Sequence, residues 1–138
     1  SYCFEPGKSA VLKDGSDVAL FACGLMVSKA LEAAEALKAE GIDAAVINAS
    51  SLKPFDRDTV VTYAKKCGAI VTAEEHSIIG GLGSAVAEVL AEEHPCIMGR
   101  VGVLDRFGQS GKPDALLEEY NLTAKDIVAK AKDIIKKK

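Results

Sequence analysis

The chain has 138 residues, of which 49% are hydrophobic and 27% charged, and its formal net charge is −3. This composition is typical of a soluble globular domain with its own core. The acidic balance argues against a nucleic-acid-binding protein, because neutralising phosphates requires a basic face. No apolar run approaches the roughly 20 residues of a membrane span, and no signal peptide is visible.

The cysteine pattern argues against a zinc-binding or disulfide-rich protein. Cys3, Cys23, Cys67 and Cys96 form no Cys-x-x-Cys pair, and their spacing suits neither a zinc site nor a small disulfide framework. We therefore expect reduced thiols packed in the core of a cytoplasmic protein.

The first predicted elements are two short strands, at residues 8–13 and 17–23. Asp14 and Gly15 between them form a tight-turn signal, so we expect a hairpin whose first strand is antiparallel to the second. A helix follows with its apolar face running from Met26 to Leu37, and Gly41 is placed to end it.

The rest of the chain alternates strands with helices. Strands are predicted at residues 42–48, 69–73 and 96–104, and helices after Asp56, after the glycines at 80–83, around Leu116 and after Thr123. Gly68 is placed to end the helix that follows Asp56. Alternation of this kind implies crossovers and a sheet covered on both faces. We expect a single domain over residues 1–138, with a three-layer α/β/α fold. Its five-stranded mixed sheet would be mostly parallel, with one antiparallel edge strand from the hairpin.

The strand at residues 69–73 leads directly into Glu74, Glu75 and His76. Folds of this class place their sites where strands end and helices begin. A carboxylate beside a histidine can orient the ring and raise its pKa, as acid–base chemistry requires. However, adjacent residues of a strand point to opposite faces, so the three cannot all share one site. A polar contact with another domain or subunit is the alternative.

Gly80, Gly81 and Gly83 open the next helix and admit two interpretations. The amides of a helix start can cradle an anion such as phosphate. Alternatively, the glycines let the helix start pack closely on its neighbours. The spacing matches neither the dinucleotide-binding Gly-x-Gly-x-x-Gly pattern nor a P-loop.

A polar, glycine-bearing loop at residues 105–111 follows the last predicted strand and contains Phe107. An aromatic in such a loop either anchors an interface or tucks into its own domain. Arg100 and Arg106 could bind anions or pair with local carboxylates. His76 and His94 are the only two histidines and lack metal-ligand spacing, so we predict no metal site.

Several of these segments together resemble the C-terminal domain of transketolase-family enzymes. The resemblance is carried by residues 72–88, 100–111, 116–123 and 126–128, and extends to Gly7, Lys8, residues 48–54 and Asp56. The Phe-Gly-x-Ser-Gly loop followed by Leu-Thr-x-x-x-Ile-Val points most narrowly to transketolase. The chain looks most like the separate C-terminal section found where transketolase is split into two polypeptides.

The resemblance implies an enzyme of the pentose phosphate pathway that moves a two-carbon ketol unit from a ketose phosphate to an aldose phosphate. In this family, thiamine diphosphate and a divalent metal such as Mg²⁺ bind between two upstream domains, so no catalytic, cofactor-binding or metal-binding residue transfers to this chain. The fragment alone is expected to be inactive. It should support domain packing in a homodimer or split-subunit assembly. Its candidate interface residues are Glu75, His76, Gly80, Gly81, Gly83, Arg106, Phe107 and Gln109.

Three alternatives stay open. The β subunit of a 2-oxoacid dehydrogenase has a similar C-terminal domain, which can dock another component of its complex, and deoxyxylulose-phosphate synthase is a second relative. From a different class, the chain could be a free-standing α/β module that holds a small anion at Gly80, Gly81 and Gly83.

Overall fold

The computed structural model describes residues 10–23, 26–49, 57–74, 82–102 and 124–138. The described strands are β1 (Ala10–Lys13), β2 (Val18–Ala22), β3 (Ala44–Asn48), β4 (Ala69–Glu74) and β5 (Ile97–Gly102). The described helices are α1 (Met26–Ala39), α2 (Arg57–Cys67), α3 (Leu82–Glu92) and α5 (Ala124–Ile135). None of these helices is long and apolar enough to cross a membrane.

The five strands form one mixed sheet in the order β1-β3-β2-β4-β5. The pairs β2–β3, β2–β4 and β4–β5 are parallel, whereas β1 is antiparallel to β3. Every residue of β2, β3 and β4 is buried, as is typical of parallel strands covered on both faces. The predicted five-stranded, mostly parallel sheet with an antiparallel edge strand is therefore confirmed.

The predicted hairpin is wrong in its pairing, because β1 lies beside β3 rather than beside β2. β3 occupies the position between them, so the link from Asp14 to Asp17 spans two inter-strand spacings, about 10 Å, instead of making a tight turn. The link passes the start of β3 closely. The Lys13 Nζ donates a hydrogen bond to the Ala44 carbonyl at 2.9 Å, and the Asp17 N–H donates to the Asp43 carbonyl at 2.8 Å.

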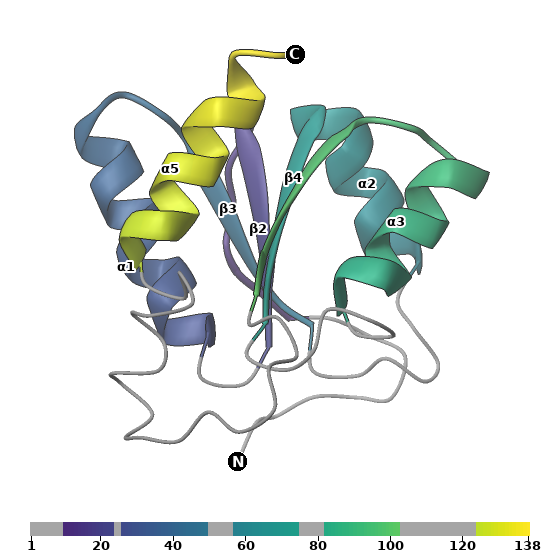
Figure 1. Cartoon of the computed structure of the whole chain (residues 1–138), viewed down its shortest axis with the longest axis horizontal. Coiled ribbons are helices and arrows are strands. Elements are labelled where there is room, and N and C mark those ends of the chain that lie inside the picture. Colours follow the sequence, from purple (N-terminus) through teal and green to yellow (C-terminus); the bar gives the residue numbers. More distant parts are fainter. Residues whose placement is uncertain (1–9, 24–25, 50–56, 75–81, 103–123) are drawn as a thin grey trace, which may run out of the picture.

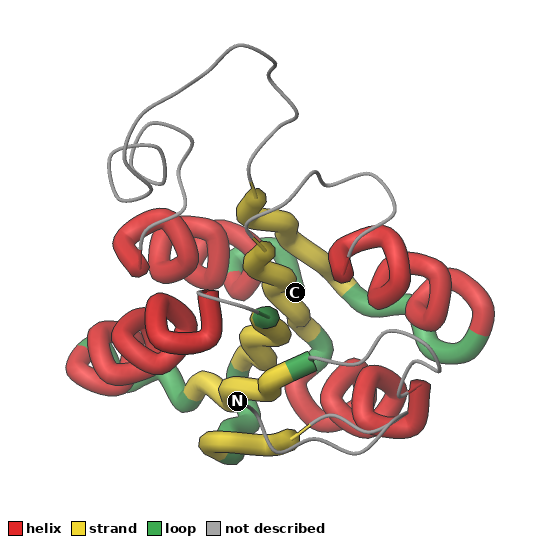
Figure 2. Tube along the Cα trace, turned by 90° about the horizontal axis from the view of Figure 1, so that it is seen from below, coloured by secondary structure: helices red, strands yellow, loops and turns green. Residues whose placement is uncertain are grey.

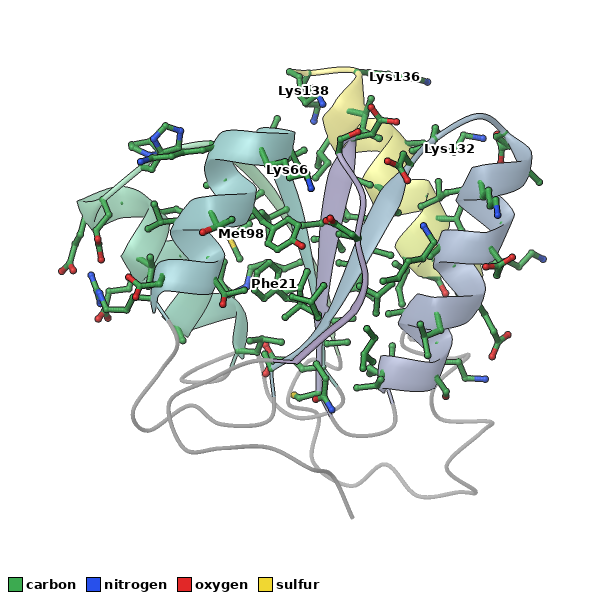
Figure 3. The ribbon with its side chains drawn as sticks, turned by 180° about the vertical axis from the view of Figure 1, so that it is seen from behind. Phe21, Lys66, Met98, Lys132, Lys136 and Lys138 are labelled. Atoms are coloured by element: carbon green, nitrogen blue, oxygen red, sulfur yellow. The ribbon has the colours of Figure 1, made fainter. Side chains whose placement is uncertain are left out.

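Helices cover both faces of the sheet, which completes the three-layer arrangement (Figures 1 and 2). α1 and α5 pack against one face and α2 and α3 against the other. Alternate residues of β2 divide between the two cores: Leu20 points toward α1 and α5, and Phe21 toward α2 and α3. Figure 3 shows Phe21 on the α2 side of the sheet. Its ring meets the ring of Tyr63 edge-on, with the two ring centroids 6.4 Å apart.

Two helices end at glycines, as the sequence predicts. Gly41 and Gly68 follow α1 and α2 with φ of 82° and 70°, a left-handed conformation that favours glycine. After α1, the Ile42 N–H donates to the Leu37 carbonyl at 2.9 Å and so satisfies one of the last carbonyls of the helix.

Side chains tie the elements together at the amino edge, the edge at which the parallel strands begin. The Asp14 carboxylate accepts hydrogen bonds from the Tyr63 hydroxyl at 2.8 Å, the Lys66 Nζ at 2.9 Å and the Gly15 N–H at 2.9 Å. The Lys138 Nζ donates hydrogen bonds to the Asp17 carbonyl, just before β2, and to the Cys67 carbonyl at the end of α2, at 2.9 Å each. Figure 3 shows Lys66 and Lys138 at this end of the molecule.

Candidate functional site

The candidate site lies at the carboxyl edge, the edge at which β2, β3, β4 and β5 end and α3 begins. Parallel strands end on the same edge, and sheets of this type bind ligands or partners there. β4 and β5 end side by side, with Glu74 paired to Gly102. The segments that follow these two strands therefore leave the sheet from neighbouring points.

Glu74 closes the start of α3. It is the last residue of β4 and only 4% exposed. Its Oε1 accepts a hydrogen bond from the Leu82 N–H at 2.9 Å, and its Oε2 accepts one from the Gly83 N–H at 2.7 Å. Amides in the first turn of a helix have no partner within the helix, and a negative charge there also suits the helix dipole. One buried carboxylate therefore supplies both the acceptors and the charge.

Strand geometry explains why Glu74 reaches α3. Side chains alternate along β4, so Glu74 shares a face with Ile70, which packs in the core formed with α2 and α3. Leu82, the first residue of α3, is fully buried in the same core. Both bonding partners are thus placed by packing on the same side of the sheet.

A side chain of β5 lies across the first turn of α3. A Cβ atom on Gly83 would sit 2.4 Å from the Nε of Arg100. The Arg100 Nη2 donates a hydrogen bond to the Ser84 Oγ at 3.2 Å. For Gly83, this contact supports the interpretation that glycine permits close packing at the helix start.

The same geometry counts against an external anion at this helix start. The amides of Leu82 and Gly83 are bonded to the Glu74 carboxylate, so a phosphate would have to displace an internal negative charge. It also favours a structural role for Glu74 over acid–base chemistry, since both carboxylate oxygens are bonded to backbone N–H groups. The sequence shows only that a glutamate ends a strand; its partners become visible once α3 is folded back on the sheet.

Among the predicted interface residues, the structure describes Gly83, which is buried at the start of α3. The others lie outside the described residues: Glu75, His76, Gly80, Gly81, Arg106, Phe107 and Gln109. Their convergence on one surface stays a prediction.

The described residues do not fit thiamine diphosphate or its metal ion. Within the described ranges, no group of three or more histidine, cysteine, aspartate or glutamate side chains could hold a metal. The amides of Leu82 and Gly83, which could otherwise face a diphosphate, are bonded to Glu74. We therefore assign no cofactor-binding role to these residues.

A shallow depression of about 530 Å³ lies at the opposite, amino edge. Its lining includes Lys65, Lys138, Cys67 and Cys96. Burial raises the pKa of the Cys67 thiol to about 11 and also raises the pKa of Cys96, so neither is a ready nucleophile at neutral pH. Both lysines lie at or just beyond the C-terminal end of a helix, where the dipole favours cations. The two lysines therefore have a structural explanation, and the described lining of the depression offers no reactive thiol that would mark it as a site.

Comparison with known proteins points to a single family. The sequence model of the family described as "Transketolase, C-terminal domain" matches residues 7–127. A 6-deoxy-6-sulfo-D-fructose transketolase subunit of Clostridium sp. (strain MSTE9) is 50% identical over 135 residues, which cover 98% of this chain and 42% of the relative. A 1-deoxy-D-xylulose-5-phosphate synthase of Heliobacterium modesticaldum is 43% identical over 129 residues, which cover 93% of this chain and 20% of the relative.

A solved structure described as a split gene transketolase, an inactive beta4 tetramer, superposes with a TM-score of 0.92 at 58% sequence identity. The match covers 96% of this chain and 44% of that one. The chain thus spans less than half the length of these relatives. The family match extends over most of the present sequence, and so the chain belongs to the transketolase family, in which it corresponds to the C-terminal domain.

Proposed function

We propose that this chain is the C-terminal, non-cofactor-binding domain of a thiamine-diphosphate-dependent transketolase, which transfers a two-carbon ketol unit between sugar phosphates. In this proposal the domain supports domain packing and dimer assembly and performs none of the chemistry. The observation that carries the structural role is the start of α3, where an internal carboxylate takes the position that an anionic ligand would need.

The partners are the N-terminal and pyrimidine-binding portions of the same enzyme, which would hold thiamine diphosphate and Mg²⁺. Support comes from a relative that is a transketolase subunit and from a similar structure that belongs to a split-gene transketolase. We infer a homodimer or a split-subunit assembly, a cytoplasmic location and a role in sugar-phosphate exchange of the pentose phosphate type.

We further propose that the carboxyl edge faces these partners. Residues Glu75 and His76 directly follow β4, and the loop with Arg106, Phe107 and Gln109 follows β5. Because Glu74 and Gly102 are paired across the two strands, both segments start within about 5 Å of each other. This adjacency supports a shared interface that includes Gly80, Gly81 and Gly83.

The decisive experiment measures ketol transfer by the chain alone, by the complementary portion of the enzyme alone and by their mixture, with thiamine diphosphate and Mg²⁺ present. We expect activity only in the mixture. Activity of the chain alone would overturn the assignment of the cofactor site to the other portions. An inactive mixture, despite a folded partner that binds the cofactor, would favour the dehydrogenase-subunit alternative.

Replacing Phe107 tests the interface directly. We expect Phe107→Ala to weaken assembly by about 2 kcal/mol, as loss of a buried aromatic anchor typically does, while the isolated domain melts as the wild type. Sedimentation or activity titration measures the assembly. Leu31→Ala is the control, because Leu31 is an apolar residue on α1 that is 38% exposed. Unchanged assembly of Phe107→Ala would contradict the proposed role.

Deoxyxylulose-phosphate synthase is the second candidate, supported by the 43% identical relative. Formation of 1-deoxy-D-xylulose 5-phosphate by the assembled enzyme would favour it. The free-standing anion-binding module has less support, because Glu74 already bonds the amide of Gly83, one of the three glycines that it invokes, and the neighbouring amide of Leu82. A sugar phosphate that raises the melting temperature of the isolated chain would revive this alternative, since a ligand bound only to the folded state must stabilise it.

A further inference from the structure

The cap of α3 comes from an unusual place. Most helices are capped by a residue immediately before their first turn, and such a cap stabilises the helix alone. Here the capping carboxylate belongs to the preceding strand, eight and nine positions upstream of the amides that it binds. A cap of this kind also fixes the helix relative to the sheet.

The two ends of this connection are each held firmly. The end of β4 is paired with β5 through Ala73 and Glu74. The start of α3 is held by the Glu74 carboxylate, by the burial of Leu82 and by Arg100 lying across Gly83. The Glu74 contacts therefore set the separation between the point where residues 75–81 leave the sheet and the point where they enter α3.

Burying a carboxylate is costly unless hydrogen bonds compensate for the lost water. Glu74 is 4% exposed and receives a backbone N–H on each oxygen. A serine, threonine or asparagine cap next to α3 would stabilise the helix without burying a charge. The feature that the local cap would not supply is the fixed connection between strand and helix.

We propose that Glu74 is a positioning residue for enzyme assembly: its carboxylate joins the end of β4 to the start of α3 and thereby holds the carboxyl edge in the geometry that the cofactor-binding portion of the enzyme contacts. This inference rests on the proposed function. It assigns Glu74 no contact with substrate or cofactor.

The test replaces Glu74 by glutamine in the complete polypeptide that carries this domain. Glutamine keeps the size of the side chain but exchanges one acceptor oxygen for an NH₂ donor, so one α3 amide loses its acceptor. The matched control is Glu88→Gln, an exposed glutamate on the same helix. We expect amide hydrogen exchange at Leu82 or Gly83, whichever loses its acceptor, to accelerate about tenfold or more in Glu74→Gln only.

The deciding measurement is the affinity for the complementary portion, taken at a temperature where circular dichroism shows every variant folded. We expect Glu74→Gln to bind about tenfold more weakly and Glu88→Gln to bind as the wild type. A domain that is merely less stable, yet folded, would assemble normally. Wild-type affinity for Glu74→Gln would therefore overturn the inference even if its amides exchange faster.

Failure of the wild type to assemble would instead overturn the proposed function, and the inference with it, so the two failures are distinguishable. Should Glu74→Gln not fold, Glu74→Asp carries the test. It keeps the charge but shortens the reach by one methylene group, so at most one of the two amide contacts survives. Weaker assembly of this variant supports the inference, and unchanged assembly overturns it.

Discussion

The two edges of the sheet are tied by different kinds of contact. At the amino edge, exposed charged side chains join distant parts of the chain: Lys66 bonds Asp14, which also accepts from the Tyr63 hydroxyl, and Lys138 bonds the Cys67 carbonyl. At the carboxyl edge, a single buried carboxylate bonds the backbone of the next helix. Each exposed ion pair contributes little to the free energy of unfolding, whereas a buried charged group that loses its hydrogen-bond partners lowers it strongly.

The two edges therefore differ in how strongly each depends on a single side chain. Many weak contacts at the amino edge can each be lost with small effect, because the backbone packing beneath them remains. At the carboxyl edge, the arrangement of strand end and helix start depends strongly on Glu74. At the amino edge, we therefore expect the largest loss of stability from substitutions that push against the backbone. At the carboxyl edge, we expect the largest loss of assembly from substitutions that remove side-chain contacts.

Matched Gly→Ala substitutions compare the two edges, and the larger effect is expected at Gly15. A Cβ atom there would lie 2.5 Å from the backbone C of Ala44 and the backbone N of Ala45. Those atoms belong to β3, which is paired on both sides and cannot move aside. We expect Gly15→Ala to lower the free energy of unfolding by about 3 kcal/mol, measured by urea denaturation.

Gly41→Ala is the control for Gly15→Ala. A Cβ at Gly41 meets nothing within 4 Å, so its only cost is the left-handed backbone, about 1 kcal/mol. If Gly15→Ala costs no more than this control, the amino edge is more adaptable than its close backbone contact indicates.

At the carboxyl edge, Gly83→Ala should cost much less. The clashing atoms belong to the far end of the Arg100 side chain, which can swing away and give up its bond to Ser84. The higher helix propensity of alanine, about 1 kcal/mol over glycine, offsets part of that loss. We expect a net change within about 1 kcal/mol by urea denaturation.

A double-mutant cycle isolates the contact between Gly83 and Arg100. In an Arg100→Ala background the obstruction is gone, so Gly83→Ala should become neutral or stabilising. Equal effects of Gly83→Ala in both backgrounds would show that the Arg100 side chain does not constrain this helix start.

Local signals in the sequence predict much of this fold. The apolar run of β4 and the glycines that end α1 and α2 are encoded within a few residues of where they act, and the structure confirms them. The neighbour of β1 could not be predicted in this way. Whether β1 pairs with β2 or β3 depends on where β3 is placed after its crossover through α1, which is a non-local property.

The candidate site shows the same limit. Glu74 stands out in the sequence as a carboxylate at a strand end, and the sequence pattern is compatible with a role in acid–base catalysis. Its role depends on the packing of α3 against β4, because only then do the amides of Leu82 and Gly83 reach its oxygens. A pattern that identifies an unusual residue therefore does not by itself distinguish a catalytic carboxylate from a capping one.

The smallest expected effect concerns the exposed contacts of Asp14. Hydrogen bonds from Lys66, Tyr63 and Gly15 lower the pKa of this carboxyl from 3.8 to about 2. Because the folded-state pKa lies below the unfolded one, the contribution to stability is complete above about pH 4 and is lost as the pH falls toward about 2. The difference in urea midpoint between wild type and Asp14→Asn should therefore be constant from about pH 5 to 8, shrink as the pH falls toward about 2 and vanish below it.

Salt provides the control for this interpretation. Asp14 is exposed, so about 1 M NaCl should shrink the difference at neutral pH by screening its pair with Lys66. The carboxyl edge should respond differently, since Glu74 is buried and its partners are backbone amides. The stability difference between wild type and Glu74→Gln should therefore survive the same salt. If salt removed both differences equally, the contrast between an exposed and a buried carboxylate would not govern how the two edges are held.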